Sequence, residues 1–368
     1  SLFVNQEGIY MKILLLGEFS AFHSNLKEGL LSQGHEVTIA SSGDGWKKIN
    51  SDIKIGTNRK GVLGKLDSLV NLVKALPKLK GYDVVQFIDP VLFPKFLGIN
   101  KAIVKFIFSN NRKIFLVAAG ATSKISVIAD FSQNRFKYPQ LYQEIKKINP
   151  DMWSQTQKGR HYNTFFLENI NGVIPIMHEY AQGFRDINYP KLCPTIPIPM
   201  NIETLKYKEN IIRDKIVFFH GLNREGMKGT PLISKAMKKL EKTYPNEVKC
   251  IIDGRMPLEK YLCFLETVNV VIDQAYSVSV GVNGVYNLAM GKVVVGGGEP
   301  EFLSEFNLSE SPLMPIKPDF ENIYQQLEWL VKNKNEITNM GLESRKFSEA
   351  LHDYKKVASQ YIEAWNKY

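Results

Sequence analysis

The stretch 220–230 (HGLNREGMKGT) has the composition of a loop that binds an anionic group. Two of its glycines, Gly221 and Gly229, free the backbone to approach a ligand, and Arg224 and Lys228 supply two positive charges. An apolar run precedes the loop and a helical pattern follows it, so the first amide groups of that helix would face the same ligand. The pattern indicates a diphosphate site; the alternative interpretation is a solvated loop.

A second segment that could carry chemistry runs from 273 to 301. An acid ends an apolar run, a polar and aromatic loop follows, and a helix of small residues leads into a valine run, three glycines and two carboxylates. Carboxylates just past the carboxyl end of a strand are placed to bind ribose or sugar hydroxyls. The candidate ligand-binding residues of this segment are Asp273, Gly281, Asn283, Tyr286, Gly297, Gly298, Glu299 and Glu301.

The loop after the first apolar run is less informative. It begins at Gly17, but Phe19 and Phe22 stand where a Gly-x-Gly-x-x-Gly dinucleotide fingerprint requires glycine, which argues against NAD binding. His23 starts the following helix and either contacts a ligand or is a surface or capping residue. Asp130 is likewise either a ligand contact or a structural residue.

Alternating apolar runs and helical patterns must position these residues. In the first half, the strand 12–16, a helix over 25–33 and the strand 36–40 form a β-α-β unit. Residues 120–150 are irregular, polar and aromatic. The other expected elements are strands at 84–88, 114–118 and 172–177 and helices at 62–80, 95–109 and 159–169.

Three prolines in 193–201 (CPTIPIPMN) predict a stiff connector and a domain boundary. Two β-α arrays joined by such a connector predict an α/β fold of two Rossmann-like, doubly wound domains, with the ligand in the cleft between them. Beyond the connector we expect strands at 215–220, 248–253, 270–273 and 293–296, helices at 232–243, 258–268 and 283–290, and a helical region 319–368 with breaks near Lys334 and Gly341.

The composition narrows the class of protein. No apolar run approaches the roughly 20 residues that span a bilayer. Three cysteines without pairing or metal spacing fit a reducing, cytoplasmic setting, and residues 1–10, ahead of Met11, lack the regions of a secretory signal. The net charge of +10 favours an anionic partner, although no motif supports nucleic-acid binding.

Together these motifs resemble those of the retaining glycosyltransferases with the GT-B fold. The similar segments are the family's opening, its diphosphate loop, its helix–strand junction and a feature of a bacterial surface-polysaccharide subgroup: 11–40 with the turn 34–37 (GHEV), 228–229 (KG), 289–292 (AMGK) and 273–274 (DQ) with Gly281. The resemblance implies transfer of a hexosyl group from a nucleoside-diphosphate sugar, UDP or GDP, to a glycan or lipid-linked acceptor. It further implies retention of configuration and no metal or other cofactor.

The resemblance also assigns roles. Arg224 and Lys228 would neutralise the charge that grows on the leaving diphosphate, and Glu299 completes the expected catalytic set. His23 and Asp130 would contact the acceptor. The donor would be bound by the residues of the second segment together with Gly17, Gly221 and Gly229. The expected domains are an acceptor domain at 11–195, a nucleotide-sugar domain at 196–346, and a C-terminal helix at 347–368 that packs back on the first.

The chain departs from the family at one pair of positions. The family usually carries two glutamates eight positions apart, the second of which meets the donor ribose, and this chain holds Val278 and Tyr286 there. We hypothesise that Glu299 or Glu301 substitutes. Two alternatives remain open: a nucleotide-sugar-binding protein without turnover, and a nucleotide-sugar epimerase that uses His220 and Asp273.

The region 59–80 is rich in lysine and in aliphatic residues. It holds six basic residues and one acid, Asp67, and its leucines and valines recur through the helical pattern. Such a helix either lies peripherally on an anionic membrane at its inner face, or packs on its own sheet with a solvated basic side.

Overall fold

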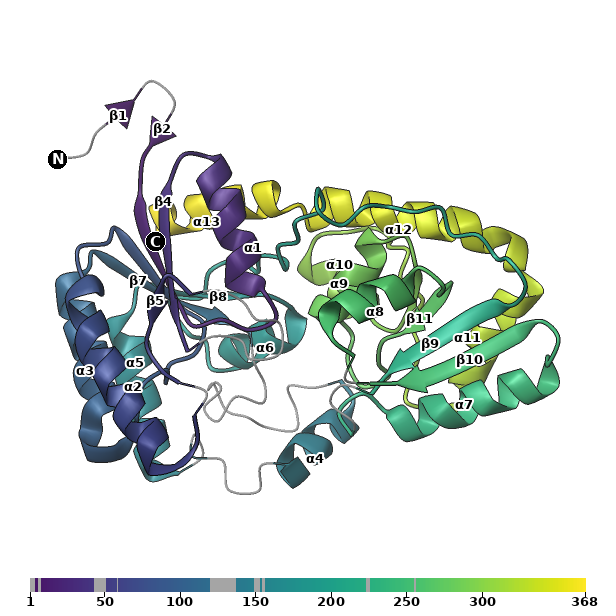
Figure 1. The fold of residues 1–368 in the computed structure, drawn as a ribbon, viewed down its shortest axis with the longest axis horizontal. Coiled ribbons are helices and arrows are strands. Elements are labelled where there is room, and N and C mark those ends of the chain that lie inside the picture. The colour runs from purple at the N-terminus through teal and green to yellow at the C-terminus, as the bar shows by residue number, and fades with distance from the viewer. Residues whose placement is uncertain are drawn as a thin grey trace.

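The computed structural model describes residues 4–5, 8–42, 51–57, 59–119, 137–148, 153, 156–222, 226–254 and 256–368. These residues form two parallel sheets with helices on both faces, arranged as two units side by side (Figure 1). A short antiparallel pair, β1 (Val4–Asn5) and β2 (Gly8–Ile9), precedes the first sheet.

The first sheet has six strands in the order β5-β4-β3-β6-β7-β8, all parallel. Counted along the chain this is the order 3-2-1-4-5-6 of a Rossmann sheet. Its strands are β3 (Lys12–Leu16), β4 (Glu36–Ser41), β5 (Ile53–Lys54), β6 (Val84–Phe87), β7 (Lys113–Ala118) and β8 (Gly172–Pro175). The helices of this half are α1 (Phe22–Ser32), α2 (Gly61–Ala75), α3 (Ile99–Asn110), α4 (Pro139–Ile148), α5 (Gln157–Asn169) and α6 (His178–Asp186), with 3-10 turns η1 (Leu76–Lys78) and η2 (Phe96–Gly98).

The second sheet has four parallel strands in the order β10-β9-β11-β12. Its strands are β9 (Ile216–Gly221), β10 (Val248–Asp253), β11 (Val270–Ile272) and β12 (Val293–Val295). The chain winds in one direction from β9 to β10 and in the other from β9 to β11 and β12, so its direction of winding reverses between β9 and β11. In open parallel sheets, ligands bind at such a reversal, outside the carboxyl ends of the strands.

Helices cover both faces of the second sheet and return to the first. They are α7 (Thr230–Thr243), α8 (Leu258–Leu265), α9 (Val282–Ala289), α10 (Pro300–Glu305), α11 (Phe320–Lys332), α12 (Ile337–Leu351) and α13 (Tyr354–Lys367), with the 3-10 turn η5 (Lys334–Glu336). Figure 1 shows α12 and α13 as consecutive yellow helices, the first beside the second sheet and the second against α1. Tyr361 and Trp365 of α13 are fully buried in a hydrophobic cluster with residues of both units.

The structure corrects three expectations about elements. Part of the region expected to be irregular forms α4, which the sequence pattern alone did not indicate. Gly341 lies inside α12 and does not break it. Its role is in packing, because a β-carbon there would lie 2.3 Å from the carbonyl oxygen of Gly291, and only glycine allows this close approach. The C-terminal region breaks instead at 352–353, between α12 and α13, as well as near Lys334.

Candidate functional site

The candidate site is built around the carboxyl ends of β9 and β11, where the second sheet reverses its winding. His220 and Gly221 end β9, and Asp273 follows β11 directly. The parallel register pairs Ile272 with His220, which places these ends beside each other. A doubly wound sheet therefore brings together the two segments whose composition indicated ligand binding.

His220 is a structural part of this edge. Its side chain is fully buried, with Nδ1 at 2.7 Å from the carbonyl oxygen of Ile272 and Nε2 at 2.9 Å from the hydroxyl of Thr230. The pKa of His220 is lowered to about 4, mainly by burial and in part by the positive charge of Lys228, while the hydrogen bond with Ile272 opposes the change. Both ring nitrogens are thus engaged, which weakens the acid–base role that an epimerase would require of this residue.

Lys228 is half-buried beside the same strand ends. Its backbone carbonyl accepts a hydrogen bond of 2.8 Å from the amide of Ala275, which ties its loop to the segment after β11. Gly229 then starts α7 with a φ of +77°, and a β-carbon there would lie 3.1 Å from the side chains of Ala275 and Tyr276. Arg224, the other expected cation, lies outside the described residues.

Asp273 is a buried carboxyl group near the charge of Lys228. Burial raises the pKa of Asp273, while the positive charge of Lys228 and the amide of Gly281 oppose that rise. A lysine and a buried carboxyl group at the reversal point can recognise a ligand with both a phosphate and hydroxyl groups.

The start of α9 leaves room at this site. Gly281 precedes the helix, and a β-carbon on it would find no protein atom within 4 Å. Asn283 in the first turn accepts a hydrogen bond of 2.7 Å from the hydroxyl of Tyr261. Tyr286 lies one turn further on; burial raises its pKa, and the negative charges of Glu18 and Glu28 raise it again. Its electrostatic environment thus includes carboxylates of the first unit.

The three glycines after β12 serve the packing of two loops. Gly297 and Gly298 have φ values of +71° and +74°, and a β-carbon on Gly297 would lie 2.8 Å from Val280. A β-carbon on Gly298 would lie 2.6 Å from Leu313. The closest neighbours of both glycines are therefore protein atoms. Loop packing explains why glycine stands at these positions, which the sequence did not reveal.

Glu299 and Glu301 meet a lysine of the first unit. The Lys137 ammonium lies 3.0 Å from a carboxylate oxygen of each glutamate, and the Tyr138 hydroxyl donates a hydrogen bond of 2.5 Å to Glu299. Glu299 is buried, and its second oxygen, Oε2, has no hydrogen-bond partner. Its amide also donates to the carbonyl of Val278 at 3.4 Å, so Glu299 adjoins the first of the two positions at which the family carries glutamate.

Glu179, which the sequence analysis did not single out, supplies another carboxylate to position 278. It is buried in the first turn of α6 and accepts hydrogen bonds from the amides of Val278 and Ser279 at 2.9 and 3.1 Å. The hydroxyls of Ser277 and Ser279 donate to the same carboxylate. A residue from the first unit therefore holds the loop before α9. The sequence predicted the preceding strand but not α6, whose first turn holds Glu179.

Helix α4 covers the loop that carries Lys228. Leu141 and Ile145 of this helix pack with Met227 and Tyr276, which flank the loop on two sides. A β-carbon on Gly226 would lie 2.9 Å from a carboxylate oxygen of Glu144. The candidate site is thus bounded by side chains of both units.

The first unit places its own candidate residues differently. Gly17 has a φ of +87°, and its carbonyl oxygen lies 2.7 Å from Nδ1 of His23. His23 is fully buried, its Nε2 lies 3.3 Å from the side-chain amide of Gln86, and burial lowers its pKa to about 4. This corrects the expectation of an acceptor contact, because both ring nitrogens already face partners inside the protein. Asp130 lies outside the described residues.

The amides at the start of α1 are also occupied. Glu18 accepts hydrogen bonds from the amides of His23 and Ser24 at 3.0 and 2.7 Å. A carboxylate at the first turn is favoured by the helix dipole and satisfies amides that lack partners within the helix. The start of α1 therefore does not offer these amides to a phosphate.

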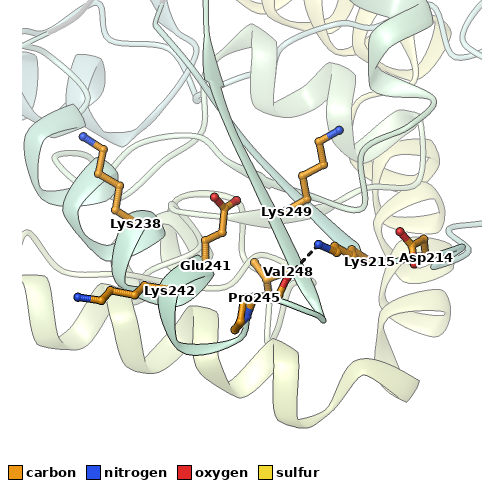
Figure 2. Close-up of a pocket in the computed structure, with 8 residues that line it drawn as sticks. All are labelled: Asp214, Lys215, Lys238, Glu241, Lys242, Pro245, Val248 and Lys249. Atoms are coloured by element: carbon orange, nitrogen blue, oxygen red, sulfur yellow. Dashed lines mark hydrogen bonds between the residues drawn. The ribbon is translucent and has the colours of Figure 1, made fainter.

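A separate surface concavity lies at the opposite edge of the second sheet (Figure 2). It is lined at the amino ends of β9 and β10 by Lys215 and Lys249, and at the end of α7 by Lys238 and Lys242. Figure 2 shows Lys238 and Lys242 pointing away from Lys249, and Lys215 bonded to the carbonyl of Pro245 at 2.9 Å. These cations diverge, so the concavity lacks a convergent anion site.

The described residues contain neither a metal-binding cluster nor a membrane-spanning helix. Within these ranges no group of three or more His, Cys, Asp or Glu side chains is placed to hold a metal ion. Among the helices that the structure describes, none has the length and hydropathy to cross a bilayer.

Comparison with solved structures identifies the fold. Sucrose-phosphate synthase from Thermosynechococcus elongatus superposes with a TM-score of 0.64 at 12% identity, over 97% of this chain and 98% of that one. The Anabaena protein HepE in complex with UDP and glucose gives 0.61 at 14% identity, over 98% and 100%. An alpha-glucosyltransferase in complex with UDP-glucose and DNA gives 0.62 at 10% identity, over 97% and 100%.

The sequence itself matches no protein-family profile and no curated protein. The structure nevertheless shares its two-sheet architecture, the GT-B fold, with these solved structures over almost its whole length.

Proposed function

We propose that this protein is a glycosyltransferase that moves a hexosyl group from a nucleoside-diphosphate sugar to a glycan or lipid-linked acceptor. The observation that carries the proposal is the half-buried Lys228 beside the buried Asp273, at the point where the second sheet reverses its winding. The shared fold supports it, because similar structures contain UDP or UDP-glucose. UDP is therefore the first nucleotide to test and GDP the second.

The proposed reaction breaks the bond between the anomeric carbon and the diphosphate oxygen and forms a bond to an acceptor hydroxyl on the same face. The leaving diphosphate takes the electron pair of the broken bond and the proton of the acceptor hydroxyl, and Lys228, with Arg224, neutralises its remaining charge. This step requires no metal in our proposal. Gly221, Gly229, Gly281 and Asn283 would line the donor.

Glu299 is proposed to act beside the donor sugar. Its buried, unpartnered Oε2 offers one acceptor for a hydroxyl group, while Oε1 is held by Lys137 and Tyr138. Because Glu299 adjoins Val278, we propose that it replaces the carboxylate that the family carries at that position. Glu301 shares Lys137 and would assist.

The first test is thermal stabilisation by UDP, GDP, ADP, CMP, NAD and the common sugar conjugates. A ligand that binds only the folded state raises the melting temperature. At a concentration one hundred times its dissociation constant, it increases the free energy of unfolding by roughly 3 kcal/mol. We expect a shift with UDP or GDP and its loss in Lys228→Ala, because the diphosphate loses its cation. Lys238→Ala, an exposed lysine of α7, is the matched control and should keep the shift.

The outcomes separate the competing functions. Transfer of sugar to an added acceptor supports the proposal. A shift without turnover supports a binding protein that lacks the family's glutamates, and conversion of the nucleotide sugar alone supports an epimerase. Absence of any shift overturns the donor site.

A lipid-linked acceptor would place the protein beside a membrane. We propose a role in bacterial polysaccharide biosynthesis, in the cytoplasm, with peripheral contact at the inner face of the membrane where a lipid-linked acceptor would be presented. The net charge of +10 supports an anionic surface as partner.

A further inference from the structure

Helix α2 turns its aliphatic side to solvent. Val62, Leu63, Leu66, Val70 and Val73 have exposed fractions of 52 to 75%. At the helical rotation of about 100° per residue, these five side chains fall within an arc of about 100°. The opposite side of α2 is the buried one, with Gly64, Leu72 and Ala75 against the first unit. Packing on the first unit therefore accounts for Leu72 and Ala75 but not for these five exposed aliphatic side chains.

A second apolar feature lies beside this arc. In η2, Leu97 is 93% exposed with a φ of +53°, and Phe96 next to it is also exposed. The Lys65 ammonium lies 5.9 Å from the centre of the Phe96 ring, which places η2 next to α2. We call the seven residues of α2 and η2 the aliphatic face: Val62, Leu63, Leu66, Val70, Val73, Phe96 and Leu97.

Cations border the aliphatic face on both sides. By the same helical rotation, Lys74 lies about 20° beyond one edge of the arc and Lys65 about 60° beyond the other. The region 59–80 contains six basic residues and a single acid, Asp67, which is paired with Arg59 at 3.1 Å. The border therefore carries a strong excess of positive charge.

We propose that the aliphatic face docks on the surface of an anionic lipid bilayer. Aliphatic side chains on a convex helix can enter the region between headgroups and acyl chains, while lysines at the margins reach the lipid phosphates. A second copy of this chain is a poorer occupant, because it would bring two basic borders together. The inference locates the peripheral contact proposed above, but it does not depend on sugar transfer.

Sedimentation with vesicles tests the proposal. Vesicles of phosphatidylcholine, with and without about one third phosphatidylglycerol, are mixed with the full chain at physiological salt and without nucleotide sugar. We expect binding to the anionic vesicles only. The double substitution Leu66→Gln with Val73→Gln should weaken this binding at least tenfold, and Lys65→Gln with Lys74→Gln should weaken it and reduce its salt dependence.

Matched controls keep the test specific. Ile187 and Ile211 are exposed aliphatic residues outside the aliphatic face, and Ile187→Gln with Ile211→Gln should bind like the parent. Melting temperatures of all variants show whether each still folds. The proposal is overturned if the parent does not bind anionic vesicles, if Leu66→Gln with Val73→Gln binds as well as the parent, or if those substitutions instead abolish self-association.

The same variants report on the proposed function independently. Nucleotide-induced melting shifts measured on them should be unchanged, because α2 lies in the first unit and Lys228 in the second. Loss of vesicle binding with an intact nucleotide shift, or the reverse, therefore identifies which of the two proposals fails.

Discussion

Gly281 and Gly297 lie in the same candidate site but have opposite surroundings. A β-carbon on Gly281 would find no protein atom within 4 Å, whereas one on Gly297 would lie 2.8 Å from Val280 and 3.0 Å from the backbone of Ser279. Gly281 has a φ of −84°, which any residue adopts, and Gly297 has a φ of +71°. The space beside Gly281 is thus available to a ligand, while the space beside Gly297 is not.

Substitution of these two glycines should therefore separate ligand binding from folding. We expect Gly281→Ala to change the free energy of unfolding by less than about 0.5 kcal/mol but to weaken nucleotide-sugar binding, because a methyl group fills the open space. Gly297→Ala should destabilise the fold by about 1–3 kcal/mol through overpacking and its positive φ. Urea denaturation and calorimetric titration measure the two effects. Unchanged nucleotide affinity in Gly281→Ala would move the donor elsewhere.

Sequence alone could place residues at the strand ends but could not determine what they contact. The site around Lys228 and Asp273 follows from strand ends that apolar runs marked clearly. The structural roles of His23 and His220 depend on partners such as Gln86 and Thr230, whose distance from each histidine is set only by folding. Glu179 was missed for the same reason, since its partners lie about 100 residues away in sequence.

At the scale of elements, α1 and α13 approach each other through a glycine. A β-carbon on Gly29 would lie 2.3 Å from the carbonyl oxygen of Tyr354 and 2.9 Å from Ala358, so the two helices meet with almost no side chain between them. Gln33 adds a bond of 2.8 Å to the hydroxyl of Ser359. This contact secures the C-terminal helix to the first unit.

We expect Gly29→Ala to destabilise the protein by about 1–3 kcal/mol, although alanine favours an isolated helix by about 1 kcal/mol over glycine. The added methyl group meets backbone, which cannot rotate away as a flexible side chain would. Lys238→Ala in α7 controls for alanine on an exposed helical position. The free energy of unfolding from urea titration is the measurement, and a stability equal to or above the parent's would show that α1 and α13 separate at little cost.

Elements with a local pattern were predictable, and those with distant partners were not. The strands 12–16 and 248–253 have the predicted bounds, since apolar residues between polar or glycine positions define them. Helix α4 packs through Leu141 and Ile145 on residues of the other half of the chain, so nothing next to it in sequence explained its apolar positions. Helix α2 was predicted as a helix, but its exposed aliphatic side appears only when the buried side is known.

At the scale of the whole molecule, three buried histidines make folding sensitive to acid. They lie in the first unit, in the second unit and at the junction of α12 and α13: His23, His220 and His352. Burial lowers the pKa of each from 6.5 to about 4. As the pH falls below 6.5, the unfolded chain therefore binds protons that the folded protein does not bind until about pH 4.

The free energy of unfolding should consequently be fully retained above pH 6.5 and fall between pH 6.5 and about 4, by up to about 3 kcal/mol for each histidine. Urea titrations across this range measure the slope. His352→Gln should reduce the slope by up to one proton. A stability that is flat down to pH 4.5 would contradict the expectation.

The connector and the α12–α13 junction meet at one place. The amide of Met200 donates to the carbonyl of His352 at 2.8 Å, and the amide of Tyr354 donates back to Met200 at 3.0 Å. The chain crosses between the units at the connector and at the α12–α13 junction, and both crossings thus lie at one place. This place is distant in sequence from the Lys137–Glu299 contact. We expect any relative movement of the two units to pivot at this place, because both chain crossings lie there and are hydrogen-bonded to each other. Elsewhere the two units are joined by the hydrogen bonds of Glu179 and by the ion pairs of Lys137 with Glu299 and Glu301, so we expect a movement at this pivot to require these polar contacts to break.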